Sequence, residues 1–219
     1  MKCIVLLGAP GSGKGTQAEN ITKWYDIPQI APGDIFRANV KAGSGLGKMV
    51  QVYIDAGRLV PDEVTIKLTR ERLAEADCAN GFILDGYPRS VAQAEALDGF
   101  LAEMGHKLNV AASIFVDDET IIKRLSGRRT CGGCGKPYHV EYNPPAVTDV
   151  CDACGAGLTR RADDCEETVR DRLSVYYERT APLIERYRRQ GVFVQITGHE
   201  AIGDTTGEMA AALRKVFGE

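Results

Sequence analysis

A glycine-rich segment near the N-terminus has the composition of a phosphate-binding loop. Residues 8–16 read GAPGSGKGT, follow a short apolar run and precede a helical pattern. Glycines let the backbone wrap around a phosphate, so that amide groups and the helix N-terminus point at the anion. Lys14 would add a positive charge for the β and γ phosphates, whereas a glycine-rich turn without a ligand is the alternative. The residues predicted to contact phosphate are Gly11, Ser12, Gly13, Lys14, Gly15 and Thr16.

Four of the seven cysteines form two closely spaced pairs that predict a metal site. Cys131 and Cys134 are separated by two residues, as are Cys151 and Cys154, and sixteen residues lie between the pairs. This spacing is typical of a closed site with four thiolates, in which a structural Zn²⁺ is expected and iron or cobalt is an alternative. Disulfides, and a zinc ribbon that binds nucleic acid, are the competing interpretations.

Seven segments of the chain together resemble the long-lid branch of the adenylate kinase family. They are GAPGSGKGTQ at 8–17, GDIFR at 33–37, AGRLVPDEV at 56–64, NGFILDGYPRS at 80–90, GRR at 127–129, YHVEYNPP at 138–145 and TRRADDCEETVRDRL at 159–173. The strict phosphate-loop motif has serine or threonine directly after the lysine. Here Gly15 follows Lys14 and Thr16 comes one position later, which is the variant seen in nucleotide kinases. The resemblance implies a monomer that transfers the γ-phosphoryl group of ATP to AMP, giving two ADP, with Mg²⁺.

Six arginines and two aspartates acquire roles from this resemblance. Guanidinium groups are planar, permanently charged forks that suit phosphate oxygens, although an arbitrary arginine is usually a solvated surface charge. The resemblance places Arg37 and Arg89 on the AMP phosphate. Those expected to close over the ATP phosphates and the transition state are Arg124, Arg128, Arg161 and Arg172, with Arg161 and Arg172 also reaching AMP. Asp85 ends an apolar run and would hold Mg²⁺ through its waters, with Asp34 in the same network.

The identity of the phosphate acceptor depends on three further residues. Gln93 matches the family position that reads the adenine of AMP, and Gly86 would let the backbone approach that base. Pro32 departs from the family, which has a hydroxyl-bearing residue where the base and ribose of the monophosphate should lie. Proline also lacks a backbone donor, so GMP, UMP or CMP stays open as an alternative acceptor.

The elements that must position these residues alternate between strand-like and helical patterns. Near-continuous apolar runs at 2–7, 28–30, 82–84, 110–116 and 192–196 indicate buried parallel strands. Helical patterns cover 13–25, 62–75, 90–104, 119–125, 166–190 and 205–217. The alternation predicts an α/β fold with a doubly wound, five-stranded parallel sheet.

Two segments interrupt that alternation and read as insertions. Residues 31–60 contain a short helical stretch, and residues 127–164 carry the cysteine pairs. We expect a core formed by 1–30, 61–126 and 165–219, a monophosphate-binding insertion at 31–60 and a lid at 127–164. The lid is too small to bury a sufficient apolar core, which gives a bound metal a structural purpose.

Bulk composition excludes several other functions. A formal net charge of -3 provides no cationic field for nucleic acid, and no apolar segment is long enough for a membrane span. We therefore expect a cytoplasmic protein whose partners are ATP, AMP and ADP, with neither nucleic acid nor membrane. A nucleotide-dependent switch is a further alternative, but the chain lacks the Asn-Lys-x-Asp guanine signature.

Overall fold

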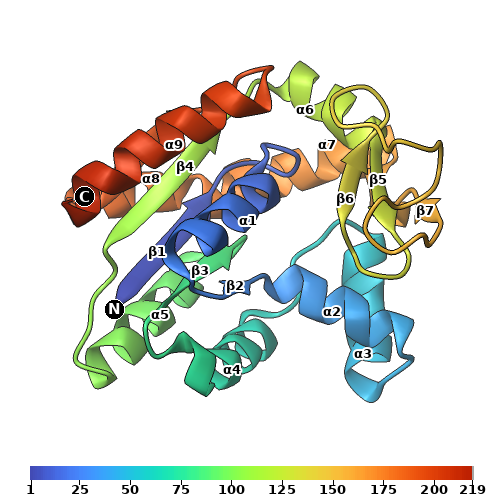
Figure 1. Cartoon of the computed structure of the whole chain (residues 1–219). Coiled ribbons are helices and arrows are strands. Elements are labelled where there is room, and N and C mark those ends of the chain that lie inside the picture. The colour runs from blue at the N-terminus through green and yellow to red at the C-terminus, as the bar shows by residue number, and fades with distance from the viewer. Residues whose placement is uncertain (219) are drawn as a thin grey trace.

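A computed structural model describes residues 1–218, and its centre is a five-stranded parallel sheet in the order β2-β3-β1-β4-β8 (Figure 1). The strands are β1 (Lys2–Leu7), β2 (Gln29–Ile30), β3 (Gly81–Asp85), β4 (Val110–Phe115) and β8 (Phe193–Thr197). The strand order reverses at β1, which pairs with both β3 and β4. The predicted α/β fold with a five-stranded parallel sheet is confirmed.

Both faces of the sheet are covered, as the continuous apolar runs predict. Ile4 and Leu6 of β1 belong to a core cluster with residues of α1, α6, α7 and α9, whereas Cys3 and Val5 face a second cluster with residues of α5 and α8. The two sets alternate because successive side chains of a strand point to opposite faces. The helices of this core are α1 (Lys14–Tyr25), α4 (Asp62–Leu73), α5 (Val91–Glu103), α6 (Asp118–Ser126), α7 (Glu166–Val175), α8 (Pro182–Arg189) and α9 (Ile202–Phe217).

The helix predicted over 166–190 is interrupted in the structure. A π-helical turn, η3 (Tyr176–Thr180), separates α7 from α8, and the Ala181 amide donates to the carbonyl of Tyr176 at 2.9 Å. Pro182 explains the break, because it lacks an N–H and its ring clashes with the carbonyl four residues earlier. Pro182 instead lies at the first position of α8, where its missing N–H has no cost.

The first insertion contains two helices, where the sequence indicated one short helical stretch. They are α2 (Pro32–Lys41) and α3 (Gly45–Asp55), joined by a turn. Ser44 caps α3 by accepting a hydrogen bond from the Gly47 amide at 3.0 Å. Phe36 and Val50 form a small apolar cluster with Val60, so the helix pair has a core of its own.

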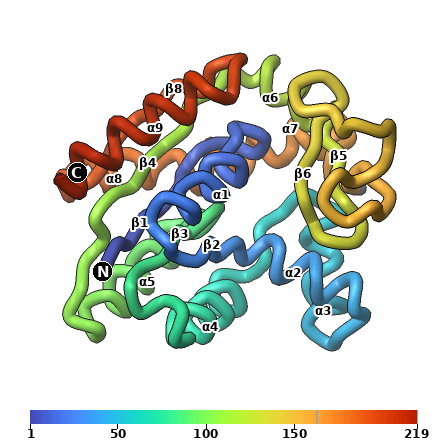
Figure 2. The backbone as a smooth tube through the Cα atoms, in the orientation of Figure 1, coloured from blue at the N-terminus to red at the C-terminus, as the bar shows by residue number. Residues whose placement is uncertain are grey.

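The second insertion contains a three-stranded antiparallel sheet in the order β6-β5-β7, which the sequence did not indicate. The strands are β5 (Arg128–Cys131), β6 (Pro137–His139) and β7 (Leu158–Thr159), and they are too short to show an alternating pattern. Figure 2 shows this insertion next to α2 and α3, on the side of the molecule away from the chain ends. Two 3₁₀ turns complete the fold, η1 (Ala76–Cys78) and η2 (Ala162–Asp164). Within residues 1–218, no helix is both long and apolar enough to cross a membrane.

Candidate active site and metal centre

One cavity of about 1030 Å³ lies at the carboxyl ends of the central strands, between the two insertions. Ligands of open α/β sheets bind at this edge, where the strand order reverses. Every residue that the sequence analysis assigned to nucleotide or Mg²⁺ binding lines the cavity. They are Gly11, Ser12, Gly13, Lys14, Gly15, Thr16, Pro32, Asp34, Arg37, Asp85, Gly86, Arg89, Gln93, Arg124, Arg128, Arg161 and Arg172.

The glycine-rich loop leads directly into α1, as the phosphate-loop motif requires. Gly13 occupies the N-cap with φ of 98°, a left-handed conformation that residues with a side chain rarely adopt. The Lys14 ammonium donates to the carbonyls of Gly8 at 2.7 Å and Ala9 at 2.8 Å, which holds it over the loop. Backbone amides, a helix N-terminus and a cation therefore face the same space.

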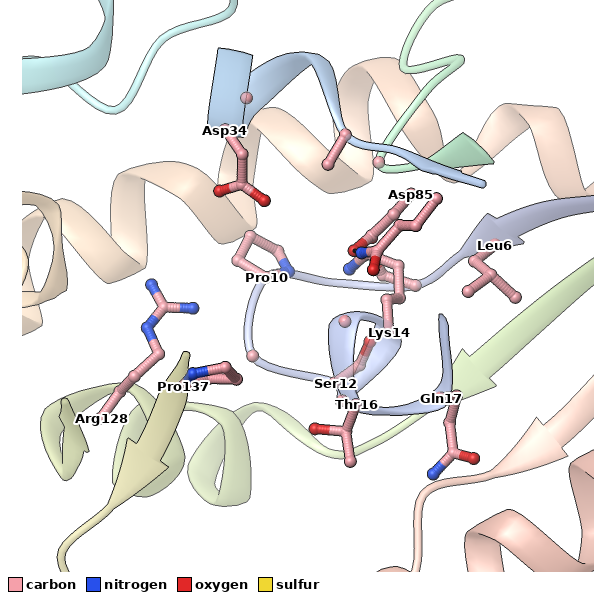
Figure 3. Close-up of a pocket in the computed structure, with 18 of the residues that line it drawn as sticks. Leu6, Pro10, Ser12, Lys14, Thr16, Gln17, Asp34, Asp85, Arg128 and Pro137 are labelled. Atoms are coloured by element: carbon pink, nitrogen blue, oxygen red, sulfur yellow. Dashed lines mark hydrogen bonds between the residues drawn. The ribbon is translucent and has the colours of Figure 1, made fainter. Parts of the chain in front are cut away.

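Lys14 and Asp85 form the charged centre at the inner end of this loop, where Figure 3 shows them side by side. Burial lowers the pKa of Lys14 to about 8, although the Asp85 carboxylate opposes the shift. Burial also raises the pKa of Asp85, against the influence of Lys14. Their mutual attraction offsets only part of the free-energy cost of desolvating the two charges. Additional charged groups bound beside them would therefore stabilise the charged forms of both side chains.

The Asp85 carboxylate fits the chemistry of a Mg²⁺ site. Its Oδ2 accepts a hydrogen bond from the side-chain amide of Gln29 at 3.0 Å, which fixes the Asp85 side chain at the end of β3. Carboxylate oxygens are hard ligands, and Mg²⁺ in nucleotide sites keeps several waters while binding one or two carboxylates and the phosphates. The oxygen donor and its place beside the phosphate loop therefore suit this ion.

Buried arginines give the cavity a concentration of positive charge. Burial, then repulsion from Arg172 and Arg37, lowers the pKa of Arg89 to about 10. Burial and repulsion from Arg37 and Arg128 lower the pKa of Arg161 to about 10 as well. Burial is also the main cause of a lowered pKa at Arg172. Cations that repel one another in a desolvated cavity would be stabilised by a polyanion.

Two adjacent aspartates orient two of these arginines, and the sequence analysis did not single them out. Asp164 accepts from Nε of Arg128 at 2.8 Å and from its Nη2 at 2.5 Å, and it lies 3.3 Å from Nη1 of Arg172. Asp163 pairs with Arg172 at 2.9 Å. Both aspartates lie in the TRRADD segment, so the motif contained the signal although their partners were not evident.

The structure places Asp34 among arginines, whereas the sequence analysis grouped it with Asp85. Its carboxylate pairs with Arg37 one turn along α2, and it lies 3.8 Å from Arg161 of the second insertion. Burial alone would raise the pKa of Asp34, but Arg37 and Arg161 outweigh it and hold the pKa below its ordinary value. Asp34 thus links the two insertions across the cavity, and a role with Mg²⁺ stays a prediction.

Two of the three residues on which the identity of the acceptor depends, Gln93 and Gly86, lie at α5 and the end of β3, whereas the third, Pro32, begins α2. Gln93 is buried and lines the cavity. Gly86 has φ of 68°, and a Cβ there would lie 2.6 Å from Nη2 of Arg89, so a side chain would disturb that arginine. Pro32 is the first residue of α2, a position that tolerates a missing N–H. Its presence is therefore compatible with the local fold.

The two cysteine pairs meet in the second insertion. The Sγ atoms of Cys131, Cys134, Cys151 and Cys154 all lie within 4.8 Å of one another, close to the separation of about 3.8 Å expected around a tetrahedral Zn²⁺. The Tyr138 hydroxyl lies 3.4 Å from Sγ of Cys151 and is the main cause that lowers the pKa of that thiol to about 6. This arrangement could hold a metal ion. All seven cysteines are free, which contradicts the disulfide alternative.

Sheet topology, phosphate loop and arginine-lined cavity together define a phosphate-loop nucleotide kinase. The sequence pattern of the adenylate kinase family matches residues 6–192. The chain is 51% identical over 213 residues to the adenylate kinase of Acetivibrio thermocellus, covering 97% of this chain and 98% of the relative. It is 55% identical over 199 residues to that of Moorella thermoacetica, covering 91% and 92% respectively. The chain belongs to the adenylate kinase family.

Proposed function

We infer that this protein transfers the γ-phosphoryl group of ATP to AMP, giving two ADP. The observation that carries this assignment is a single cavity in which a phosphate loop faces several buried arginines. Phosphoryl transfer requires little covalent chemistry from a protein, because positioning and charge stabilisation supply most of the rate. Membership of the adenylate kinase family agrees with that chemistry.

We propose that the loop and its lysine bind ATP while the opposite wall binds AMP. Amides of residues 11–16 and the ammonium of Lys14 would surround the β and γ phosphates. Arg37 and Arg89 would hold the AMP phosphate, and Arg161 and Arg172 would reach both nucleotides. Arg124 and Arg128 would neutralise charge on the group being transferred, where a well-placed arginine is worth about 10³–10⁵ in rate. The acceptor is a phosphate dianion, so the reaction requires no dedicated general base.

Asp85 is our proposed ligand for Mg²⁺, through water molecules, with Asp34 nearby. When bound with ATP, this ion would supply positive charge that offsets the negative charge of the phosphates. The protein would hold the Asp85 carboxylate beside Lys14. The hydrogen bond that the Gln29 side-chain amide donates to Asp85 supports this role.

We propose three functional parts: a core of 1–30, 61–126 and 165–219, a monophosphate-binding insertion of 31–60 and a lid of 127–164. Two contacts support closure of the lid onto the other insertion. Lys41 of α2 donates to the carbonyl of Gly132 at 2.5 Å, and Arg161 lies 3.8 Å from Asp34. Closure excludes water, which would prevent hydrolysis of the transferred group.

Zinc is our proposed metal in the lid, because four thiolates at tetrahedral spacing favour it. Such a site is closed, so its role is structural rather than catalytic. The protein is also proposed to act as a monomer, since the candidate residues of both nucleotide sites come from one chain.

The test is to mix the protein with ATP, Mg²⁺ and each nucleoside monophosphate and to measure the diphosphates formed. Rapid conversion of AMP, with slow conversion of GMP, UMP and CMP, is expected. Preference for another monophosphate would keep the mechanism and change the acceptor. Absence of transfer to any of the four would overturn the assignment.

A further inference from the structure

The side-chain amide of Gln93 lies between two groups of opposite hydrogen-bonding character. Its Nε2 donates to Oδ1 of Asp62 at 2.7 Å, and its Oε1 accepts from the backbone amide of Arg89 at 2.8 Å. Asp62 is the first residue of α4, whereas Arg89 immediately precedes the cap of α5. The base-reading residue of the proposed AMP site is therefore held by both elements.

These two partners permit only one orientation of the amide. A carboxylate accepts hydrogen bonds and cannot donate, while a backbone N–H donates and cannot accept. Rotating the Gln93 amide by half a turn would place its oxygen against the Asp62 carboxylate and its NH₂ group against the Arg89 amide. Because Gln93 is 2% exposed, water cannot relieve either conflict.

The fixed amide keeps one N–H and one lone pair for a ligand, and the residue lines the cavity. Adenine presents an amino donor beside a ring nitrogen acceptor, so its amino group can donate to Oε1 while its ring nitrogen accepts from Nε2. Guanine presents a carbonyl beside a ring N–H, which is the reverse pattern. To pair with guanine in the same position, the amide would have to rotate.

We propose that Asp62 is a specificity-determining positioning residue, which fixes the Gln93 amide in the orientation that pairs with adenine and rejects guanine. This inference rests on the proposed function, in that Gln93 faces the base of the monophosphate. Asp62 does not line the cavity and acts through Gln93. Discrimination between adenine and guanine then depends on the Asp62 carboxylate, which can only accept a hydrogen bond from Gln93.

Asp62 is itself held in place, as a positioning residue must be. Its Oδ2 accepts from the Ser90 hydroxyl at 2.9 Å and lies 3.9 Å from Nη2 of Arg179. The Ser90 hydroxyl oxygen also caps α5 by accepting from the backbone N–H of Gln93 at 3.2 Å. Ser90 thus connects the start of α5 to Asp62. This connection fixes Asp62 relative to the Arg89 backbone N–H, which is the other partner of the Gln93 side chain.

Asp62→Asn tests the proposal, because an asparagine amide can present either an acceptor or a donor to Gln93. The measurement is kcat/KM with AMP and with GMP, at saturating ATP and Mg²⁺. We expect the ratio of the two values to fall by at least about tenfold, since a bond to a charged group is exchanged for one that tolerates rotation. The KM for ATP should not change.

Glu63→Gln is the matched control. Glu63 is exposed and follows Asp62 in the first turn of the same helix, so both variants remove one negative charge from one helix N-terminus. We expect Glu63→Gln to keep the AMP to GMP ratio of the unmodified protein. Should Asp62→Asn fail to fold, Asp62→Ser offers a hydroxyl that likewise donates or accepts.

An unchanged ratio in a folded Asp62→Asn or Asp62→Ser protein would overturn the proposal, even if its thermal midpoint falls. An equal fall of the ratio in Glu63→Gln would also overturn it, because the cause would be the helix charge. The unmodified protein separates this inference from the proposed function. If it does not prefer AMP, the function assignment fails first; if it prefers AMP and the variants keep that preference, only the role of Asp62 fails.

Discussion

Asp164 and Arg128 form a bidentate pair between the end of the second insertion and its first strand, β5, with donor–acceptor distances of 2.8 and 2.5 Å. The Asp164 side chain is fully buried, whereas that of Arg128 is 19% exposed. Parallel N–H···O bonds fix the plane of a guanidinium as well as its position. This aspartate also lies 3.3 Å from Arg172, so one carboxylate orients two arginines of the cavity.

Asp164→Asn should therefore impair catalysis more than it impairs folding. The amide keeps one acceptor and turns a donor towards a guanidinium, which would displace Arg128 and Arg172. A misplacement of about 1 Å in such a site can cost about 10²-fold in rate. We expect kcat to fall by about that factor in a steady-state assay of ADP formation.

Glu166→Gln is the control for this loss of charge. Glu166 pairs with Arg170 on the surface of α7, at 2.8 Å, and both side chains are more than half exposed. Exposed pairs of this kind contribute about 0–1 kcal/mol. The control should keep the unmodified kcat, and an Asp164→Asn protein that does likewise would exclude an orienting role for Asp164.

Lys14 makes the binding of ATP dependent on pH. Burial lowers the pKa of its ammonium to about 8 in the free protein, so the group loses its charge as the pH rises through that value. The value of kcat/KM for ATP reports the free enzyme and should fall above about pH 8. Bound phosphates favour the charged ammonium, so kcat should persist to higher pH than kcat/KM.

Lys14→Arg provides the matched measurement for this profile. A guanidinium keeps its charge at pH 8 and above, where the ammonium loses it, although it is less well matched to the loop. The variant should be slower and should lose the alkaline fall in kcat/KM. If kcat/KM for ATP falls above about pH 8 in Lys14→Arg as well, the titrating group is not Lys14.

Sequence reasoning succeeded where function depends on residues that are close in the chain. The phosphate loop occupies nine consecutive residues, and each half of the metal centre is a CxxC pair, so local spacing was sufficient. The break in the long helix also had a local signal, because a proline at 182 ends or kinks a helical pattern. Such a proline indicates a break near this position, but the π-helical form of the turn before α8 is evident only in the structure.

The missing parts of the site depend on contacts between distant residues. Arg128 and Asp164 are 36 residues apart, and Asp62 and Gln93 are 31 apart. The two members of each pair lie in different elements, so local spacing offers no reason to pair them. The short strands of the lid were missed for the same reason, since β7 has only two residues and is defined by its pairing with β5.

Metal binding should depend on Cys134 and be independent of Cys165. Both cysteines are exposed, but only the first belongs to the four-sulfur cluster. We expect about one zinc per chain by elemental analysis in the unmodified protein and in Cys165→Ser, and a much lower content in Cys134→Ser. Removing the metal with a chelator should lower the thermal midpoint of the lid, because metal binding in such small units contributes about 10–16 kcal/mol.

Equal zinc contents in the two serine variants would contradict the four-cysteine site. A full zinc content without any change of thermal midpoint on chelation would instead separate metal binding from lid stability. The same samples can be tested for iron and cobalt, which thiolate sites also accept.

At Gly47, α3 approaches α2 closely within the first insertion (residues 31–60). A Cβ at this position would lie 2.1 Å from the carbonyl oxygen of Asn39, so Gly47→Ala must displace the backbone of α2 or α3. Gly45 is two residues earlier in α3, and a Cβ there meets nothing within 4 Å. Alanine at Gly45 should be neutral or stabilise by up to about 1 kcal/mol.

Thermal unfolding of the two alanine variants isolates this contact, since they make the same chemical change in the same turn. Overpacking of this kind costs about 1–3 kcal/mol, so we expect a lower midpoint for Gly47→Ala and no decrease for Gly45→Ala. Displacement of α2 would also move Arg37 and Asp34, so the KM for AMP should rise in Gly47→Ala while the KM for ATP stays constant. Equal midpoints and equal KM values for AMP in the two variants would show that the approach of α2 to α3 does not position the acceptor site.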